Sequence, residues 1–525
     1  MYTSRPEDPA IDRKYEEALV AAESQLGRVH PARVAGKEIH APETFTVWSP
    51  IEPTLKIGTF SQCGMAETEA AILAAGGEAY SDWSQTPWER HCACIREAAD
   101  RMEEEIFELA ALITLECAKT RNEALAEVGE AVALLRYHTS VIRDNEGFRR
   151  SMPADTKTDR YESVLCPHGA WAVISPFNFP LVLGGAGGAA AAALITGNTA
   201  IMKPASAAPL SMLTFCQILE ESGGVPAGGA ANCITGSGPP AFGKIISQSP
   251  GIAGVTFTGS RDAGMWLRQE FTTHQPYPKP MILELGSKNP PCIVTAQADL
   301  KQAAEGVCRG AFGFSGQKCS ATSRVYVEEA VFPTFADILT ERVTRCTTGD
   351  PREKGVFTGP LINREAKERF DAAVASVISA GGEVLIGGQS YSGKETHYAH
   401  FAEPTIVTGI PHDHPVMKNE LFVPLVVLAM YNGIDEGIRL ANETDYGLTA
   451  GIFSKDPAEV EAFFSRIRFG VCYANRKDGG ATTGGWPEYQ SFGGWNSSGS
   501  TGRGVGGPYY LLSYMREQAQ TRLRG

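Results

Sequence analysis

The sequence predicts an α/β protein with two lobes, each built on a β-sheet with helices packed against it. Three observations lead to this prediction. Short apolar runs of strand length alternate with helix-length segments, which is the pattern of a parallel, doubly wound sheet. The chain has 525 residues, which is too many for one ordinary hydrophobic core. Its 56 glycines and 32 prolines indicate frequent tight turns within a folded chain.

The helical part of the first lobe runs from about Ala66 to Tyr137. Within it, the stretches Trp88 to Leu112 and Asn122 to Tyr137 repeat apolar residues at intervals of three and four, with charged residues on the opposite face. We expect these stretches to form long helices at the surface.

Two series of short β-like runs follow the helices. The first series predicts strands at Tyr161 to Leu165, Ala170 to Ser175, Thr199 to Lys203, Ala231 to Thr235 and Gly254 to Thr258. The second predicts strands at Pro291 to Val294, Arg324 to Val327, Glu383 to Ile386 and Pro424 to Ala429. A parallel sheet with helical connections is the usual frame of a dinucleotide site, so we expect the first lobe to hold one.

The C-terminal part combines a Gly/Ser-rich stretch from Gly479 to Gly507 with the apolar run Tyr509 to Met515. We interpret this run as a late strand that contacts another subunit. A lone edge strand would leave its apolar side chains exposed.

Charge and cysteine content exclude several partners. The net charge of −13 and the pI near 5.4 disfavour nucleic acid and anionic lipid, both of which favour a basic surface. The twelve cysteines lack the paired spacings of a zinc site and the density of a disulfide scaffold, so we expect no metal and a reducing compartment. Met1 to Pro9 lacks the apolar run of a secretory signal, which makes the cytoplasm the expected location.

The segment from Ser163 to Met202 has no charged side chain over a length that could span a bilayer. Three prolines and six glycines interrupt it. We therefore interpret it as strand, loop and buried helix of an α/β interior, and expect no membrane partner.

Cys319 is the candidate nucleophile. It lies in Phe-Ser-Gly-Gln-Lys-Cys319-Ser-Ala-Thr-Ser-Arg324, a Gly-containing loop just before a predicted strand, where a thiol can be exposed and rigidly held. A nucleophilic cysteine needs such access and a positive or dipolar environment that favours the thiolate. The alternative, in a chain with twelve cysteines, is a small buried residue.

Two further side chains suit a reaction through a thioester. Glu284, in Ile-Leu-Glu284-Leu-Gly, ends an apolar run, and a partly desolvated carboxylate with a raised pKa can activate water to cleave a thioester. Asn178, in Ser-Pro-Phe-Asn178-Phe-Pro, is held stiffly, and its NH2 can stabilise an oxyanion together with the backbone N–H of Cys319. Taken alone, Glu284 could be a solvated strand-end acid and Asn178 could cap the following helix.

Seven motifs resemble, in order and spacing, those of the aldehyde dehydrogenase superfamily. They are Pro-Phe-Asn178-Phe-Pro, Lys203-Pro-Ala, Phe257-Thr-Gly259-Ser260, Glu284-Leu-Gly, Gly316-Gln-Lys-Cys319, Asn419-Glu420-Leu-Phe422 and Ser491-Phe-Gly-Gly. The resemblance covers about Glu43 to Thr521. Within the superfamily, Gly-Gln-Lys-Cys-Ser-Ala, the stretch Gly129 to Tyr137 and the segment at Thr482 look most like Δ1-pyrroline-5-carboxylate (glutamate semialdehyde) dehydrogenases.

The resemblance implies a role for each catalytic candidate. Cys319 attacks an aldehyde substrate, Asn178 holds the oxyanion, and hydride leaves for a nicotinamide. Glu284 then activates the water that hydrolyses the thioester.

The resemblance also implies an NAD site. Lys203 matches the residue that binds the adenosine ribose, Glu420 the one that binds the nicotinamide ribose, and Phe422 the neighbour that packs on the cofactor. Gly259 and Ser260 match the turn that meets the pyrophosphate at a helix N-terminus.

Five positions bear on cofactor and substrate choice. Ser206 stands where an acid often rejects the phosphate of NADP, so NADP is acceptable beside NAD. Ser287 and Val423 replace family glycines, Ser491 replaces a proline, and Asn496 stands where lysine is usual. These changes touch the cofactor cleft and the loop that holds the substrate tail, which fits a divergent specificity.

The fold that the resemblance implies is aldehyde dehydrogenase-like. It has a Rossmann-type NAD(P)-binding domain (1–149 and 167–282), an α/β catalytic domain (283–473), and a small β oligomerisation element with the substrate-anchor loop (150–166 and 474–525). We expect a homodimer or homotetramer.

The candidate substrate is glutamate semialdehyde. Its α-carboxylate needs donors, which Ser320 and the loop residues Thr482, Thr483 and Gly484 would supply as hydroxyl and backbone N–H groups. Three aromatic residues crowd the same loop: Trp486, Tyr489 and Phe492. An aromatic aldehyde, or an aliphatic one, is therefore the alternative.

Two other functions stay open. A CoA-acylating dehydrogenase would pass the acyl group to CoA, but such relatives usually lack the glutamate found at 284. A non-catalytic structural protein would keep the fold without the chemistry, and the joint presence of Cys319, Glu284 and Asn178 speaks against it.

Overall fold

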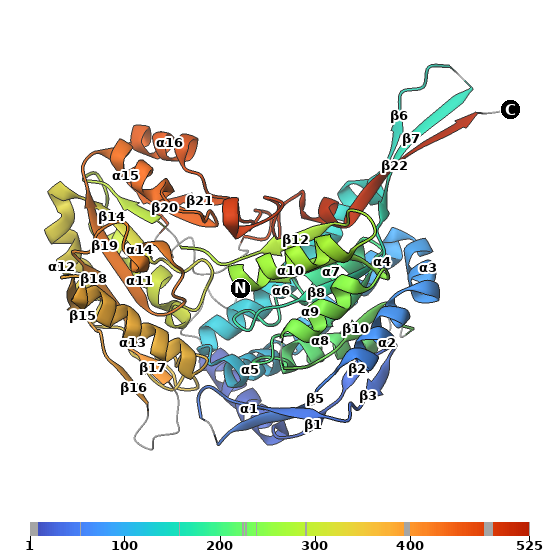
Figure 1. The fold of residues 1–525 in the computed structure, drawn as a ribbon, viewed down its shortest axis with the longest axis horizontal. Helices are drawn as coiled ribbons and strands as arrows, with labels where there is room; N and C mark the ends of the chain where they lie inside the picture. Colours follow the sequence, from blue (N-terminus) through green and yellow to red (C-terminus); the bar gives the residue numbers. More distant parts are fainter. Residues whose placement is uncertain are drawn as a thin grey trace.

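The computed structural model describes residues 9–52, 54–156, 158–222, 225, 228–237, 239–288, 291–392, 400–476 and 487–523. Within them the chain forms two lobes, each centred on a seven-stranded sheet, and an arm that projects from the first lobe (Figure 1). This architecture confirms the predicted α/β class.

The sheet of the first lobe has the strand order β12-β11-β8-β9-β10-β2-β3. Its parallel strands are β8 (Ala170–Ile174), β9 (Thr199–Lys203), β10 (Ala231–Cys233), β11 (Ile252–Thr258) and β12 (Met281–Glu284). The antiparallel strands β2 (Ala32–Val34) and β3 (Lys37–Ile39) complete it. The strands predicted between residues 170 and 258 are all present, in the parallel arrangement expected.

Helices cover both faces of this sheet. One face shares a core with α4 (Trp88–Glu104), α5 (Ile106–Cys117), α6 (Arg121–Asp144), α7 (Ala189–Ile195) and α8 (Leu210–Glu221). The opposite face packs against α2 (Met65–Ala75), α9 (Pro239–Gln248) and α10 (Arg261–His274), with α3 (Gly77–Gln85) following α2. The two predicted helices form, although the first divides into α4 and α5 at Glu105.

The expectation that these helices lie at the surface is wrong for α5. Ten of its twelve residues are buried. α5 packs against α6 and α8 and is covered as well by α1 (Pro9–Gln25), whose Tyr15 hydroxyl donates a 2.5 Å hydrogen bond to Thr114. Because a covering helix can come from any part of the chain, the periodicity of α5 alone does not reveal it.

The sheet of the second lobe has the order β15-β18-β19-β14-β13-β20-β21. Its strands are β13 (Pro291–Val294), β14 (Arg324–Glu328), β15 (Glu383–Ile386), β18 (Thr405–Thr408), β19 (Leu425–Tyr431), β20 (Thr449–Phe453) and β21 (Val471–Ala474). Its main helices are α11 (Leu300–Phe312), α12 (Phe332–Val343), α13 (Arg364–Ser379), α14 (Pro415–Lys418), α15 (Ile434–Asn442) and α16 (Pro457–Arg466). The strands predicted here are all present as well.

Two smaller sheets flank the lobes. One consists of β1 (Val29–His30), β4 (Thr44–Trp48) and β5 (Lys56–Ser61), and the other of β16 (Ser390–Ser392) and β17 (His400–Ala402). Neither was predicted.

The arm is a three-stranded antiparallel sheet made of β6 (Arg149–Met152), β7 (Asp159–Pro167) and β22 (Met515–Leu523). β22 pairs with the whole length of β7, from Met515 opposite Pro167 to Leu523 opposite Asp159. Figure 1 shows this sheet standing away from both lobes. The C-terminal tail therefore lies beside the segment that precedes β8.

The prediction that Tyr509 to Met515 forms a strand is wrong. Residues Tyr510–Tyr514 form a 3-10 helix, and β22 begins only at Met515. Tyr510 and Tyr514 are buried in the first lobe, with their hydroxyls 2.8 Å apart and the Tyr514 ring 4.6 Å from that of Trp171. The apolar run therefore covers its own core, whereas mostly polar residues form the strand of the arm.

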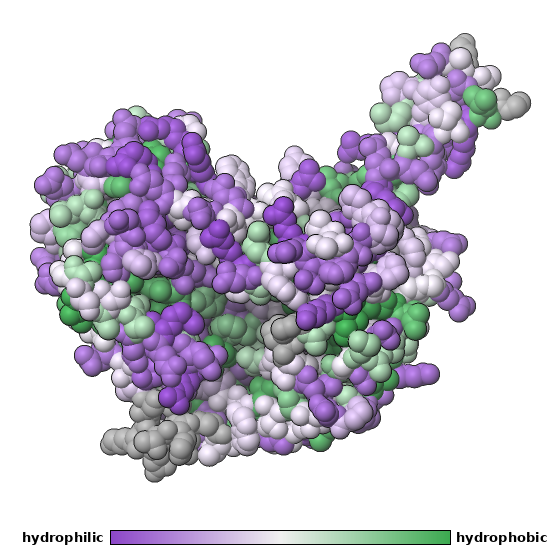
Figure 2. All heavy atoms as spheres, in the orientation of Figure 1, coloured by the Kyte–Doolittle hydropathy of each residue, from purple (hydrophilic) through white to green (hydrophobic). Residues whose placement is uncertain are grey.

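Hydrophilic residues cover most of the face shown in Figure 2, and hydrophobic residues appear in patches across the middle of both lobes. In the part of the chain that the structure describes, no helix combines the length and apolar character needed to cross a membrane. The uncharged stretch from Ser163 to Met202 instead contributes most of β7, then β8, the buried helix α7 and most of β9.

Candidate active site

The parallel strands of the first lobe bring several predicted residues to one edge of the sheet. The register pairs Ile174 with Lys203 and Thr258 with Glu284. The loop that carries Asn178 therefore starts beside Lys203, at the carboxyl ends of the strands. Ligands of open α/β sheets bind at this edge.

Cys319 reaches the same edge from the second lobe, in the loop between α11 and β14. The side-chain amide of Asn178 donates a hydrogen bond to the carbonyl oxygen of Gln317, two residues before Cys319, at 3.0 Å. The carboxyl group of Glu284 is close enough to affect the pKa of the Cys319 thiol. The structure thus brings the three candidate catalytic residues together where the lobes meet.

The loop before Cys319 has an unusual backbone. Phe314 and Ser315 have φ of 51° and 52°, in the left-handed region that few non-glycine residues adopt. Gly316 has φ of 68°, and a Cβ there would lie 2.4 Å from the carbonyl oxygen of Val423. Only glycine fits at that position, so the rigid loop expected around the thiol is present.

The Cys319 thiol is half-buried. Burial, followed by the nearby carboxyl groups of Glu420 and Glu284, raises its pKa to about 12. The backbone N–H groups of Cys319 and Ser320 lower this pKa and supply part of the dipolar environment expected from the sequence. Burial outweighs them, so the thiol is protonated at neutral pH. The carboxyl groups of Glu284 and Glu420, which are proposed for hydrolysis and for cofactor binding, lie too close to Cys319 to favour its thiolate.

This raised pKa predicts the response of the thiol to pH. Because the thiolate is the nucleophile, alkylation of Cys319 by iodoacetamide should accelerate about tenfold per pH unit between about pH 7 and 9, without a plateau. Glu420→Gln should increase the rate at about pH 8.5, where the Glu420 carboxyl, with a pKa of about 7, is ionised. Mass spectrometry of the tryptic peptide 319–324 measures the rate, and a plateau below about pH 8 would contradict the prediction.

Glu284 ends β12 with its carboxyl group shielded from solvent. Its Oε2 accepts a hydrogen bond from the backbone N–H of Gly494 at 3.2 Å, whereas the buried Oε1 has no partner among the described residues. Burial raises the pKa of this carboxyl well above its usual value. Such a group suits a base that holds a water molecule and takes its proton, and the alternative of a solvated strand-end acid does not fit.

Asn178 is buried at the junction of the lobes. The alternative that it caps the following helix is wrong, because the next helix, α7, begins only at Ala189. A primary amide has two N–H donors, and the bond to Gln317 uses one of them. The second remains available for an oxyanion.

Lys203 fits a dinucleotide site at the end of β9. Its buried ammonium donates to the carbonyl oxygens of Pro204 and Gly236, both at 2.9 Å, and burial lowers its pKa to about 8. An ammonium has three donors, so one remains for a ligand hydroxyl. Ser206 lies half-buried three residues later.

Glu420 lies against the segment that follows Glu284. Its Oε1 accepts the backbone N–H of Ser287 at 2.7 Å, and a Cβ at Gly286 would lie 2.1 Å from its Oε2. Glycine at 286 thus leaves the room that this carboxylate needs, and Oε2 can accept a ribose hydroxyl. Phe422 has φ of 58°, with its ring 6.0 Å from that of Phe177.

The turn at Gly259 and Ser260 leads directly into α10. The Ser260 hydroxyl accepts the N–H of Ala263 at 3.4 Å and so caps this helix. The Gly259 N–H donates to the carbonyl oxygen of Glu284 at 3.1 Å. A pyrophosphate would therefore meet the first turn of α10 rather than the N–H of Gly259.

The predicted substrate residues are only partly described. Ser320 is buried beside Cys319, whereas Thr482, Thr483 and Gly484 lie outside the described residues. Trp486 lies outside them as well. The other two aromatic residues of that loop are Phe492, which is buried, and Tyr489, which is 61% exposed. Phe492 therefore packs inside this chain, whereas Tyr489 faces solvent.

Two features of the site were not predicted. Gly494, which binds Glu284, belongs to the Phe492-Gly-Gly motif that served only to indicate a family. The second feature is a buried ion pair between Lys119 and Glu127, which contacts the loop that carries Asn178. The sequence signal that could have indicated this ion pair is Glu127, a glutamate among the apolar positions of the predicted helix at 122–137.

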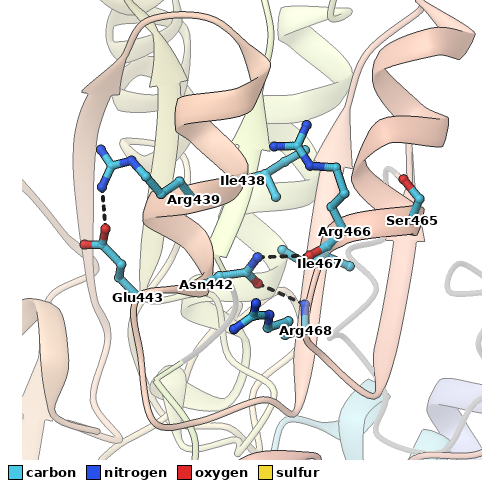
Figure 3. A pocket seen from close by; sticks show the side chains of 8 residues that line it. All are labelled: Ile438, Arg439, Asn442, Glu443, Ser465, Arg466, Ile467 and Arg468. Atoms are coloured by element: carbon cyan, nitrogen blue, oxygen red, sulfur yellow. Dashed lines mark hydrogen bonds and ion pairs between the residues drawn. The ribbon is translucent and has the colours of Figure 1, made fainter.

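A surface groove between α15 and α16 lies apart from these residues (Figure 3). Its lining residues are Ile438, Arg439, Asn442, Glu443, Ser465, Arg466, Ile467 and Arg468. The Asn442 side chain bridges the carbonyl oxygen of Arg466 and the N–H of Arg468, at 3.0 and 2.9 Å. None of the candidate catalytic or cofactor residues lines this groove, so it is not the candidate active site.

Comparison with known proteins gives one family. Residues 38–519 match the aldehyde dehydrogenase family. A 1-pyrroline-5-carboxylate dehydrogenase of Geobacillus sp. (strain WCH70) is 33% identical over 514 residues, which cover 97% of this chain and 95% of the relative. The 1-pyrroline-5-carboxylate dehydrogenase 1 of Halalkalibacterium halodurans is 32% identical over 516 residues, covering 97% and 95%.

Solved structures share the fold. A 1-pyrroline-5-carboxylate dehydrogenase from Thermus with bound NAD has a TM-score of 0.92 at 29% identity, covering 98% of this chain and 97% of that one. A lactaldehyde dehydrogenase has a TM-score of 0.87 at 26% identity, covering 95% and 100%.

Proposed function

Because the chain belongs to the aldehyde dehydrogenase family, we propose that it oxidises an aldehyde to a carboxylic acid through a thioester on Cys319. The observation that supports this most is the meeting of a thiol, an amide donor and a buried carboxyl at the junction of the lobes. Each of the three groups performs one step that the reaction requires.

In the first half of the proposed reaction, the Cys319 thiol gives its proton to solvent and its sulfur attacks the carbonyl carbon of the aldehyde. The oxygen becomes an oxyanion, which accepts hydrogen bonds from the Asn178 amide and the backbone N–H of Cys319. Bound NAD supplies the acceptor for the hydride that this carbon releases. A thioester on Cys319 remains.

In the second half, Glu284 takes a proton from a water molecule, whose oxygen attacks the thioester carbon. The carbon–sulfur bond breaks, the carboxylic acid leaves, and the proton held by Glu284 passes to the Cys319 sulfur. The buried Oε1 of Glu284 without a described partner is the atom suited to hold that water.

NAD is the proposed cofactor. Lys203 and Glu420 each offer a polar atom to a ribose, and the N-terminus of α10 offers backbone N–H groups to the pyrophosphate. The Thermus relative with this fold binds NAD. Ser206 puts no negative charge near the adenosine ribose, so NADP is also acceptable.

Glutamate semialdehyde is the proposed substrate. Two relatives that match nearly the whole chain at 32–33% identity are named 1-pyrroline-5-carboxylate dehydrogenases. Ser320, buried beside Cys319, would donate its hydroxyl to the substrate carboxylate. An aromatic or aliphatic aldehyde is the second candidate, since Phe492 is buried and a lactaldehyde dehydrogenase shares the fold.

A substrate panel tests this choice. We expect kcat/KM for glutamate semialdehyde to exceed the values for propanal and benzaldehyde by at least about 100-fold, because sites built for polar groups discriminate strongly. Ser320→Ala should lower kcat/KM about 10-fold or more for glutamate semialdehyde, since it removes a hydrogen bond to a charged group. The same variant should leave propanal nearly unaffected, and an equal loss for both aldehydes would contradict the carboxylate role.

The alternative of a CoA-acylating enzyme is tested by the same assay with and without CoA. Turnover that requires CoA would support it, and the buried Glu284 carboxyl opposes it. A non-catalytic relative would form no NADH with any aldehyde.

We also propose that the arm joins subunits in a homodimer or homotetramer. β22 and β6 are its two outer strands, with backbone groups available to a partner. A cytoplasmic location is proposed because none of the twelve cysteines, all in described segments, forms a disulfide.

A further inference from the structure

Glu127, on α6, binds the loop that carries Asn178. Its Oε1 accepts hydrogen bonds from the backbone N–H groups of Leu181 and Val182, at 3.0 and 3.2 Å. Its Oε2 accepts one from the Lys119 ammonium at 2.5 Å, and both side chains are buried. Both oxygens of this carboxylate are thus engaged, and the loop after Asn178 is tied to the helix.

Lys119 contacts both loops of the site through aromatic rings. Its nitrogen lies 3.6 Å from the ring centre of Phe179, the residue after Asn178. It also lies 5.0 Å from the ring centre of Phe314, in the loop before Cys319. A cation over a ring is attracted to it, so the ion pair stabilises both loops where they meet.

Glu123, one turn earlier on α6, holds the second loop. Its Oε1 pairs with the ammonium of Lys318, the neighbour of Cys319, at 3.2 Å. Its Oε2 accepts the Thr120 hydroxyl at 3.1 Å, which fixes the carboxylate. Residues four apart lie on one face of a helix, so one face of α6 holds both loops.

We propose that this face of α6 sets the distance between the nucleophile and the oxyanion donor, with Glu127 as a positioning residue. This proposal rests on the proposed function, which gives Cys319 and Asn178 their roles. A buried ion pair is weak evidence for stability, and a fixed geometry is the better reason to keep one here. A displacement of about 1 Å at a reacting group can lower a rate about 10²-fold.

Two double variants test whether the anchor controls the chemistry. Lys119→Met/Glu127→Gln removes the charges but keeps an oxygen for the two N–H groups, whereas Lys119→Met/Glu127→Ala removes that oxygen as well. Rapid mixing gives the rate constant for the first NADH formed and, separately, its amplitude. We expect the rate constant of the Gln variant within about threefold of wild type and that of the Ala variant about 10²-fold lower.

A merely structural anchor would give a different result. The amplitude and the Tm would then fall in the Ala variant while its rate constant stayed at the wild-type value, and this outcome would overturn the proposal. Should the Ala variant fail to fold, Glu127→Asp keeps the charge but shortens the side chain, and the same loss of rate constant is expected. A wild-type rate constant in a folded Glu127→Asp would equally overturn it.

Glu220→Gln is the matched control, because it breaks the Arg33–Glu220 pair of the same lobe, which contacts neither loop. We expect a lower Tm and an unchanged rate constant. An NADH assay of the wild-type enzyme distinguishes this proposal from the proposed function. If the wild type forms no NADH from any aldehyde, the proposed function is refuted. An active wild type with an unaffected Ala variant would refute only the positioning role.

Discussion

Cys319→Ala is expected to lower kcat by at least about 10⁴-fold, the scale of loss when a covalent nucleophile is removed. The proposed reaction needs a sulfur that bonds to the substrate carbon, and Cys319 supplies it. Binding of NAD should be unchanged, because Lys203, Glu420 and α10 supply its proposed contacts. NADH formation measures the first quantity and a calorimetric titration with NAD the second.

Cys472→Ala provides the matched control for this experiment. Cys472 is another half-buried cysteine of the second lobe, and its sulfur lies 3.3 Å from the carbonyl oxygen of Phe469. We expect this variant to keep nearly full activity. Full activity in Cys319→Ala would end the thioester mechanism, whereas a parallel loss of NAD binding would place Cys319 in the cofactor site.

The sequence was most informative where a local pattern determines the structure. The strands at 199–203, 291–294 and 383–386 have the predicted bounds, because short β-branched or apolar runs between turns leave few alternatives. The run at 509–515 gave the wrong element because a run this short does not distinguish a strand from a buried helical turn. Its neighbour Trp171, which lies about 340 residues earlier, decides the outcome.

The candidate site likewise has features that the sequence predicted and features that it did not. Asn178, Glu284 and Cys319 lie in motifs that limit their chemistry, and the structure brings them together from three separate loops and strands. The raised pKa of Cys319 was not predicted, because its largest cause is burial, which depends on how the two lobes pack around the thiol; the carboxyl groups of Glu420 and Glu284 add to it. The support of the Asn178 loop by Glu127 was missed because the two come from distant segments.

The pH dependence of the hydrolysis step follows from the raised pKa of Glu284. A protonated carboxyl cannot accept a proton from water, so hydrolysis is slow below this pKa and accelerates as the pH rises through it. Since burial raises the pKa of Glu284, the rising limb of the pH–rate profile for hydrolysis should lie above the usual pKa range of carboxylates. Glu284→Gln should lack this rising limb of the pH–rate profile.

Glu284→Gln is expected to release about one NADH per active subunit and then stall. The first half of the reaction uses Cys319 and Asn178, so thioester formation should continue at nearly the wild-type rate. Loss of a general base typically lowers a rate about 10² to 10⁴-fold, which would stop hydrolysis on the time scale of a rapid-mixing trace. Mass spectrometry of the stalled enzyme should show the acyl group on the tryptic peptide that begins at Cys319.

The other outcomes of this experiment distinguish three roles for Glu284. Loss of the first NADH would mean that the carboxylate acts before acylation, for example by taking the proton of the Cys319 thiol, whose pKa of about 12 makes such help valuable. Unaltered turnover would make Glu284 structural and would favour transfer to CoA, with acyl-CoA formation as the measurement. Only a stall after one NADH, with the acyl group on Cys319, supports Glu284 as the base for water.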